Sequence, residues 1–414
     1  MSRPTSCFVI AALLVTGSLV IAGDLNPPAG PVAPTMKTLD EVEARTPINA
    51  TNTPGDTDSL YKITQPGSYY LTGNITGVVG KHGIEIVSSG VTLDLNGFDL
   101  VGVPGMGAFD GVSVTVDSLR GITVRDGSVR NWGDGGVDLG FLSRGCRVEG
   151  VVTSGNTGTG ITASISASVT GCTSSFNGQR GIRASNGSTI SHCSVESNTG
   201  AGIEVNNGCA IANCSAYLNT AHGMLTGVGC TVIDSSGYQN TLHGLQVGEG
   251  GTVTRCTVYT NGGRGINAGD GCTVTECTSN RNSNTGITVG AGGTIKDCTA
   301  RLNTLNGISC AGRSRVIGNT CDANGNGGDG AGILASGTDS RIEDNLCTAN
   351  DRGIDIDGFA TLIVRNTCSA NTVNWDVNIG NVCLVVTVFT TPAFSGNAGG
   401  TAPGSTDPSA NFTL

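Results

Sequence analysis

Residues 286–307, GITVGAGGTIKDCTARLNTLNG, hold one unit of the repeat that decides the architecture of this chain. Three stretches of the unit alternate small or β-branched residues with polar ones, and they cover residues 286–289, 293–296 and 298–301. This alternation, interrupted by Gly and Asn turns, predicts three strands of about three to five residues each. One such unit cannot bury its inner face alone, whereas copies stacked about 4.8 Å apart can. The unit therefore predicts an all-β parallel solenoid.

Glycine marks the repeat at a constant interval of 21 residues. The glycines are Gly160, Gly181, Gly202, Gly223, Gly244, Gly265, Gly286 and Gly307 and, after a step of 25, Gly332 and Gly353. An asparagine keeps the same interval from Asn156 to Asn324 and continues at Asn350 and Asn371. Looser copies reach upstream to Gly83 and bring the expected number of coils to about thirteen. Equivalent residues would lie above one another, so the Asn amides can bond from coil to coil.

Cysteine occupies a third column of the repeat. Its members are Cys172, Cys193, Cys214, Cys256, Cys277 and Cys298. Stacked neighbours have Cα atoms close enough for a disulfide, yet their Cβ vectors run parallel, which is poor disulfide geometry. Cysteine also packs well as a small buried hydrophobe. We therefore predict mostly free, inward-facing thiols, with inter-coil disulfides as the alternative.

The chain outside the repeat divides into an export signal, a linker and two caps. Arg3 and the apolar run of residues 8–22 describe a secretory signal peptide, and the run is too short to span a membrane. We expect a protein that is secreted, extracellular or on the cell surface, with the periplasm as an alternative, and no membrane span in the mature chain. The predicted segments are the signal peptide (1–22), a Pro-rich linker (23–37), an N-terminal cap that begins with a short helix (38–79), the solenoid (80–377), and a C-terminal strand and tail cap (378–414).

The composition of the chain is acidic and rich in glycine. Its formal net charge is −10, it contains 66 Gly, and 13% of its residues are charged. This sparse negative charge argues against nucleic acid as a partner, because phosphate binding needs clustered Lys and Arg. The 37% share of hydrophobic residues supplies enough apolar surface to exclude global disorder.

Two stretches of the repeat resemble the coil of the right-handed parallel β-helix family, which has the fold of pectin and pectate lyases. They are TIKDCTARLN at residues 294–303 and RIEDNLCTAN at residues 341–350. The resemblance covers about residues 80–375 and implies that the solenoid is right-handed. It implies no single activity, because this fold hosts lyases, hydrolases, epimerases and adhesins. The chain also lacks the paired aspartates of galacturonan hydrolases and the Trp-Ile-Asp-His run of pectate lyases.

The N-terminal third is where the repeat lengthens, and longer loops on one face of a solenoid carry binding sites. Aligning the coils brings His82 and Glu85 below Asp110, with Asp134 and Asp138 above it. Carboxylates on adjacent coils are hard oxygen ligands, and they predict a Ca²⁺ site. Calcium is the one cofactor that the sequence suggests, with a solvated acidic face as the alternative.

Further residues of the same region are candidates for contact with a saccharide. They are Arg120, Arg130, Trp132 and Asp134, and the Trp132 ring is expected to stack on a sugar. No residue is assigned a catalytic role. Farther along the chain, His222 and His243 share one column, which predicts an exposed ladder rather than a metal site.

Two functions of different classes remain open. The first is a carbohydrate-binding or structural module, favoured by nearly uninterrupted coils with few loops to build a cleft. The alternative is a polysaccharide lyase or glycoside hydrolase that acts on acidic polysaccharide through the N-terminal acidic face. An outward face without a pocket would favour the module, whereas Ca²⁺ beside an Arg would favour the enzyme. Either way we expect a polysaccharide or cell-surface glycan as partner and favour a monomer.

Overall fold

The structure is a computed structural model that describes residues 44–387 and 407–413. The predicted signal peptide (1–22), linker (23–37) and the helix expected after Thr38 lie outside the described residues. Within the described ranges the chain forms strands and turns and contains no helix. In that part of the chain there is accordingly no helix with the length and hydropathy that a membrane span needs.

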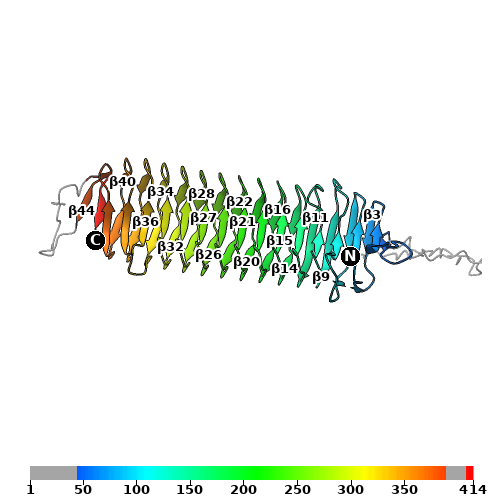
Figure 1. The fold of residues 1–414 in the computed structure, drawn as a ribbon. Helices are drawn as coiled ribbons and strands as arrows, with labels where there is room; N and C mark the ends of the chain where they lie inside the picture. Colours follow the sequence, from blue (N-terminus) through cyan, green and yellow to red (C-terminus); the bar gives the residue numbers. More distant parts are fainter. Residues whose placement is uncertain (1–43, 388–406, 414) are drawn as a thin grey trace, which may run out of the picture. The chain divides into compact units, whose positions relative to one another are not determined.

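A parallel sheet of fifteen strands runs through the described coils, with one strand from each coil (Figure 1). In order, the strands are β2 (Ser59–Ile63), β5 (His82–Ile86), β8 (Val112–Ser113), β10 (Val137–Asp138), β12 (Ile161–Ala163), β15 (Ile182–Ala184), β18 (Ile203–Val205), β21 (Met224–Thr226), β24 (Leu245–Val247), β27 (Ile266–Ala268), β30 (Ile287–Val289), β33 (Ile308–Cys310), β36 (Ala331–Ala335), β39 (Arg352–Ile356) and β42 (Val373–Val377). The prediction of about thirteen coils was too low, because β2 and β42 belong to coils that lack the Gly-Ile pair.

The unit at residues 286–307 has the three strands that its alternation predicts. These are β30, β31 (Thr294–Lys296) and β32 (Thr299–Arg301). The 21-residue interval is also the pairing register, since Ile287 pairs with Ile308 and Thr294 with Arg315. The all-β parallel solenoid is therefore confirmed, and successive coils follow one another in chain order (Figure 1).

Alternation along each strand decides which side chains enter the core. In β30, Ile287 and Val289 are buried while Thr288 between them is only half-buried. The Gly before each such strand lies against the asparagine column: a Cβ atom on Gly202 would come within 2.7 Å of Asn219 Nδ2 and of the Gly223 carbonyl oxygen. The Gly and Asn columns thus share one period, because each Asn amide fills the space that a side chain at the Gly position would need.

The asparagine column forms a continuous ladder of hydrogen bonds inside the turn between the third strand of one coil and the first strand of the next. Asn219 donates from both its backbone N and its Nδ2 to Asn240 Oδ1, each at 3.1 Å. The same two bonds recur from Asn156 to Asn350. Every amide on the ladder thus satisfies a buried backbone N–H that would otherwise have no partner.

The fifteen cysteines of the described residues are all free, and fourteen of them are buried. This confirms the prediction of inward-facing thiols over inter-coil disulfides for that part of the chain. The thiols of Cys277 and Cys298 accept the backbone bond that asparagine accepts elsewhere in this column. Cys256 N donates to Cys277 Sγ at 3.4 Å, whereas Cys298 N donates to Asn319 Oδ1 at 2.9 Å.

Strand pairing begins upstream of the predicted solenoid boundary at residue 80. The short β1 (Thr46–Pro47) pairs with β3 (Gly67–Tyr70), and β2 pairs with β5. The segment 46–79, predicted as a cap, therefore supplies strands to the same sheets.

The C-terminal end of the described chain adds a strand to the last coils. β45 (Asn411–Thr413) pairs in parallel with β41 (Thr367–Ser369) and with β44 (Val385–Thr387). Asn411 Oδ1 accepts a hydrogen bond from Asn366 N at 2.9 Å, as the next coil's residue would. This arrangement covers an edge that would otherwise expose unpaired backbone groups.

Candidate functional site

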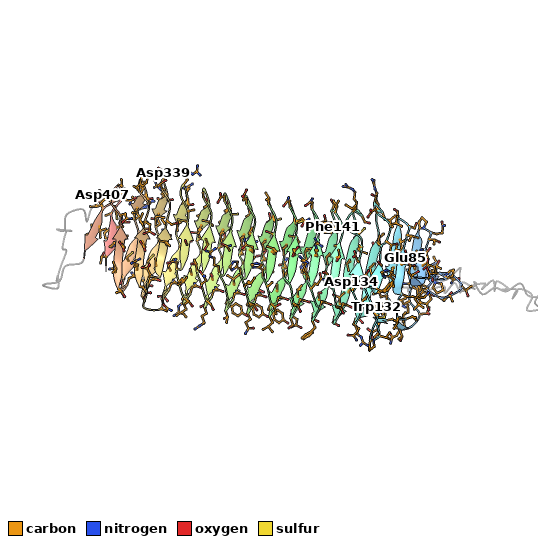
Figure 2. The ribbon with its side chains drawn as sticks, viewed as in Figure 1. Glu85, Trp132, Asp134, Phe141, Asp339 and Asp407 are labelled. Atoms are coloured by element: carbon orange, nitrogen blue, oxygen red, sulfur yellow. The ribbon has the colours of Figure 1, made fainter. Side chains whose placement is uncertain are left out.

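A cavity of about 420 Å³ lies on the outward face of the fifteen-stranded sheet, over β8, β10, β12 and β15. We call it the acidic pocket; Figure 2 labels two of its residues, Asp134 and Phe141. Its polar and aromatic lining consists of Asp110, Asp134, Asp138, Phe141, Thr159, Thr162, Gln179 and Arg183. Acidic, amide, hydroxyl, aromatic and cationic groups therefore meet within one cavity.

The strand register places one column of side chains along the floor of the acidic pocket. Asp138 follows the inward Val137, so alternation turns its carboxylate outward. Asp138 pairs with Ser113 on one side and with Thr162 on the other, and Thr162 pairs with Arg183. The floor thus runs from acidic to basic along the direction of the solenoid.

Asp110 is the most enclosed acid of the pocket, with 7% of its surface exposed. Ser113 Oγ donates to its Oδ2 at 3.0 Å, and the Gly135 N–H donates to its Oδ1 at 2.7 Å. Burial, and next the negative charge of Asp138, raise the pKa of Asp110 to about 7. Near neutral pH this side chain is therefore present in both protonation states.

Two ionisable neighbours of Asp110, Asp138 and His82, also have shifted pKa values. Burial raises the pKa of Asp138, and the charge of Asp134 adds to the effect, although the Gly140 N–H bond at 2.8 Å opposes it. His82 Nδ1 accepts the backbone N–H of Asp110 at 3.0 Å, and burial lowers the pKa of this histidine. A neutral imidazole thus lies beside Asp110, and its proton is on Nε2.

An aromatic ring and a cation form another part of the pocket wall. The Arg183 guanidinium carbon lies 4.6 Å from the centre of the Phe141 ring. Arg183 Nε is also 3.9 Å from Glu204 Oε1. A half-buried ring backed by a guanidinium offers an apolar surface and donor groups together, which is the combination that saccharide sites use.

A second cavity of about 420 Å³ shares Gln179 with the acidic pocket and reaches along the same face to β21. Arg180, Glu204, His222 and Leu225 are among its lining residues. The two cavities together cross six strands, β8 to β21, which at the spacing of neighbouring strands is about 24 Å. We refer to this stretch as the outer groove.

A family model described as right handed beta helix region matches residues 67–221, 164–294 and 243–398. The chain belongs to the right-handed β-helix family. No curated protein matches its sequence. This membership confirms the resemblance carried by residues 294–303 and 341–350, together with its handedness.

Solved structures similar to this β-helix include two modules from Azotobacter vinelandii. The A-module of mannuronan C-5 epimerase AlgE6 is 16% identical with a TM-score of 0.52, covering 73% of this chain and 90% of that one. The AlgE4 A-module is 16% identical with a TM-score of 0.47, covering 72% and 88%. The Dettilon tailspike protein is 15% identical with a TM-score of 0.44, covering 70% and 58%. At these identities the likeness is one of fold.

The β-helix brings one of the four predicted saccharide contacts, Asp134, into the acidic pocket. Arg120 is exposed outside the pocket, and its backbone forms a single parallel β-bridge with the backbone of Arg144. Arg130 pairs with Asp99 at 3.0 Å, on strand β9 (Thr123–Arg130). These two arginines do not line either cavity of the outer groove.

The expectation for Trp132 was wrong, because this ring belongs to the core of the β-helix. Only 1% of it is exposed, and its Nε1 donates to the Leu100 carbonyl oxygen at 3.1 Å. Its backbone N donates to Asn156 Oδ1 at 3.0 Å, which is the bond that ladder asparagines make. Trp132 therefore occupies the first position of the asparagine column and faces inward as that column does.

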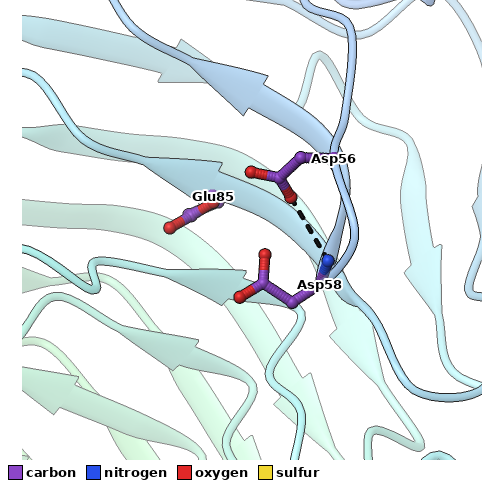
Figure 3. Close-up of side chains that lie close together, drawn as sticks. All are labelled: Asp56, Asp58 and Glu85. Carbon is purple, nitrogen blue, oxygen red and sulfur yellow. Dashed lines mark hydrogen bonds between the residues drawn. The ribbon is translucent and has the colours of Figure 1, made fainter.

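The predicted calcium ligands divide between two places. Asp110, Asp134 and Asp138 line the acidic pocket, whereas Glu85 lies in another cluster with Asp56 and Asp58 (Figure 3). Within the described ranges, this second cluster is the one whose candidate ligand atoms lie within 4.8 Å of one another. Calcium at the three aspartates of the pocket stays a prediction.

The Glu85 cluster already contains a cation of the protein. Lys62 Nζ lies 2.7 Å from both Asp56 Oδ2 and Glu85 Oε2. These contacts raise the pKa of Lys62 and lower the pKa of Asp56. Glu85 is 3% exposed and also accepts a hydrogen bond from Thr115. Lys62 therefore already pairs with two of the three carboxylates, so the cluster contains an ion-pair network of the protein's own groups.

Several pocket residues are absent from the sequence-derived site. Thr162 and Arg183 stand in the column of Asp138, and Gln179 stands in the column of Asp134, so the repeat register could have located them. Phe141 has no such signal, because it follows β10 in a turn whose length differs from that of the regular coils.

Proposed function

We propose that this protein is an exported, extracellular carbohydrate-binding β-helix that holds a saccharide chain in the outer groove. The observation that carries the proposal is the acidic pocket, where Asp134, Gln179 and Arg183 line one cavity together with the Phe141 ring. Saccharides bind through many hydroxyl bonds to charged and amide groups plus apolar contact with a ring. The groove continues over about 24 Å, which suits a chain of several sugars rather than a single one.

Export is the part of the proposal that rests on the sequence alone. The predicted signal peptide, residues 1–22, would place the protein in the extracellular space, at the cell surface or in the periplasm. The epimerase module that shares the fold is named for mannuronan, a polysaccharide, and this makes polysaccharides the first ligand class to test.

A polysaccharide-cleaving enzyme is the second candidate. The outward face carries a pocket, whereas a face without one was the expected mark of a simple module, and one acid of that pocket also favours the enzyme. The pKa of Asp110 is raised to about 7 by burial, so a protonated carboxyl is available near neutral pH. A glycoside hydrolase needs such an acid to protonate the leaving oxygen, with a second carboxylate nearby. Asp138 in the same pocket would be that carboxylate, and an acidic polysaccharide would be the substrate.

The test uses the protein without its predicted signal peptide and a panel of acidic and neutral polysaccharides, with Ca²⁺ or with chelator. We expect binding that weakens in Asp134→Asn and is unchanged in Glu276→Gln, which removes an exposed charge on another face. New reducing ends, or chelator-sensitive unsaturated products, that vanish in Asp138→Asn would establish the enzyme and distinguish hydrolysis from lysis. Absence of both binding and cleavage on every polymer would refute the proposal.

A further inference from the structure

At the far end of the second cavity, the outward face carries two histidines on adjacent coils, followed by an arginine. His222, His243 and Arg264 precede β21, β24 and β27 and lie on three consecutive coils. The two imidazole centres are 5.0 Å apart with an interplanar angle of 45°. All three side chains are half-buried, and His222 also lines the outer groove. The column therefore continues the groove by two coils.

Backbone bonds set the tautomer of both histidines. His222 Nδ1 accepts the N–H of His243 at 3.3 Å, and His243 Nδ1 accepts the N–H of Arg264 at 2.9 Å. Burial lowers the pKa of His222, and burial together with His222 and Arg264 lowers that of His243 to about 4. Each ring is neutral near pH 7 with its proton on Nε2. Because Nδ1 is engaged and Nε2 is protonated, the pair presents hydrogen-bond donors and no free lone pair for a metal.

Arg264 differs from the other arginines on this face of the described sheet. Arg180 and Arg183 lie against Glu204, and Arg352 pairs with Asp355 at 2.8 Å. Arg264 forms no ion pair within the described residues. Its Nη1 donates to Asn267 Oδ1 at 2.8 Å, and its buried Nε has no hydrogen-bond partner there. A positive charge without a counter-ion is thus held beside two neutral donors.

We propose that His222, His243 and Arg264 form an oxyanion site for the acid group of a glycan, either a uronate carboxylate or a sulfate ester. The proposal rests on saccharide binding in the outer groove and names the chemical class bound there. Arginine matches both oxyanions with paired donors, and neutral Nε2–H groups add bonds without further charge. The two outer members are two coils apart, about 10 Å, which is the span of roughly two sugars. Acid groups would bind at this end of the groove, away from the carboxylates of the acidic pocket.

The test measures affinity by calorimetry for three probes: tetragalacturonate, a chondroitin sulfate tetrasaccharide and neutral cellotetraose. Arg264→Gln is compared with Arg281→Gln, which removes an exposed arginine in a different column. We expect Arg264→Gln to weaken the binding of an acidic probe about tenfold or more and to leave the binding of cellotetraose unchanged. The control variant Arg281→Gln should bind all three probes as the wild type does. Whichever acidic probe binds more tightly identifies carboxylate or sulfate as the group recognised.

A second variant protects the test against misfolding. In His243→Asn, the Asn Oδ1 can keep the bond from Arg264 N while the outward Nε2–H donor is lost. We expect weaker binding of the acidic probe with an unchanged melting temperature. Nitrogen-15 spectra of the histidines should show the Nε2–H tautomer before any probe is added.

The outcomes separate this inference from the proposed function. If cellotetraose binds as well as the acidic probes and Arg264→Gln has no effect, the oxyanion site is refuted while saccharide binding stands. If Arg264→Gln and Arg281→Gln weaken the acidic probes equally, diffuse charge explains the affinity and the site is again refuted. If no probe binds at any concentration tested, both proposals fail. Zn²⁺ binding through Nε2 of both histidines would refute the tautomer on which the site depends.

Discussion

The asparagine ladder should be a main source of stability in this β-helix, and Asn240→Ala tests this directly. The side chain of Asn240 is 1% exposed and takes part in four hydrogen bonds. Its Oδ1 accepts from the N and Nδ2 of Asn219, and its Nδ2 donates to Ala216 O and Asn261 Oδ1. The substitution removes all four at once.

The magnitude follows from which partners stay unpaired. Asn219 Nδ2 keeps its bond to the Val195 carbonyl, and Asn261 Oδ1 keeps the bond from Asn240 N. The buried N–H of Asn219 loses its acceptor, at a cost of about 1–3 kcal/mol, and each remaining bond contributes about 1 kcal/mol net. We therefore expect a local loss of about 4–6 kcal/mol, which corresponds to well over a hundredfold change in an equilibrium constant.

Amide hydrogen exchange is the decisive assay, because a repeat array does not have to unfold in one step. The Asn219 amide should lose protection by about a hundredfold or more, and urea unfolding followed by circular dichroism should move to lower denaturant. Thr241→Ala is the matched control, since this neighbouring side chain is exposed and should change stability by about 0.5 kcal/mol or less. The reasoning is refuted if Asn240→Ala behaves like Thr241→Ala and the Asn219 amide stays protected.

Three further predictions concern the pocket, the core and the thiols. The pKa of Asp110 is raised on folding from 3.8 to about 7, so its contribution to stability is fully present below pH 4 and is lost as the pH rises to 7. Asp110→Asn should therefore raise the melting temperature relative to the wild type at pH 8 but not at pH 4; an equal shift at both values would contradict the assignment. Trp132→Ala should lower the free energy of unfolding in urea by about 3–5 kcal/mol. Phe141→Ala should weaken saccharide binding with little loss of stability. The reverse pattern would show that Trp132, and not Phe141, is the ring that contacts the saccharide. A thiol reagent should label the native protein slowly, starting with the half-buried Cys383, and label all fifteen described cysteines after unfolding without reductant; a lower number would reveal disulfides.

The regular coils were predictable because stacking makes spacing in the sequence equal to spacing in the fold. Residues 21 apart share a column, so the Gly, Asn and Cys columns identify the strands, the turns and the inward thiols. The same register predicted that Asp110, Asp134 and Asp138 would lie close together, and they line one cavity. The register also places Trp132 in the asparagine column, 24 residues before Asn156, although its aromatic ring suggested a sugar contact instead.

The coil ends and the walls of the pocket could not be predicted in this way. β2 and β42 lack the Gly-Ile pair, and their assignment to the sheet comes from pairing with the neighbouring coil. Glu85 stands in the column of Asp138, but Lys62 on the preceding coil draws its carboxylate into a separate ion-pair network. Which partner a charged side chain contacts depends on side chains from other coils, and the column shows only which residues are neighbours.

Periodicity alone thus establishes the solenoid, its three strands per coil and the asparagine ladder, because each of these depends on contacts repeated at one interval. The acidic pocket depends on the segment between Asp110 and Phe141, where the interval breaks and turns of unequal length direct each side chain individually. There the tertiary structure decides that Trp132 enters the core and that Phe141 meets Arg183. A repeat specifies what every coil has in common, whereas this site is made by what its coils do not share.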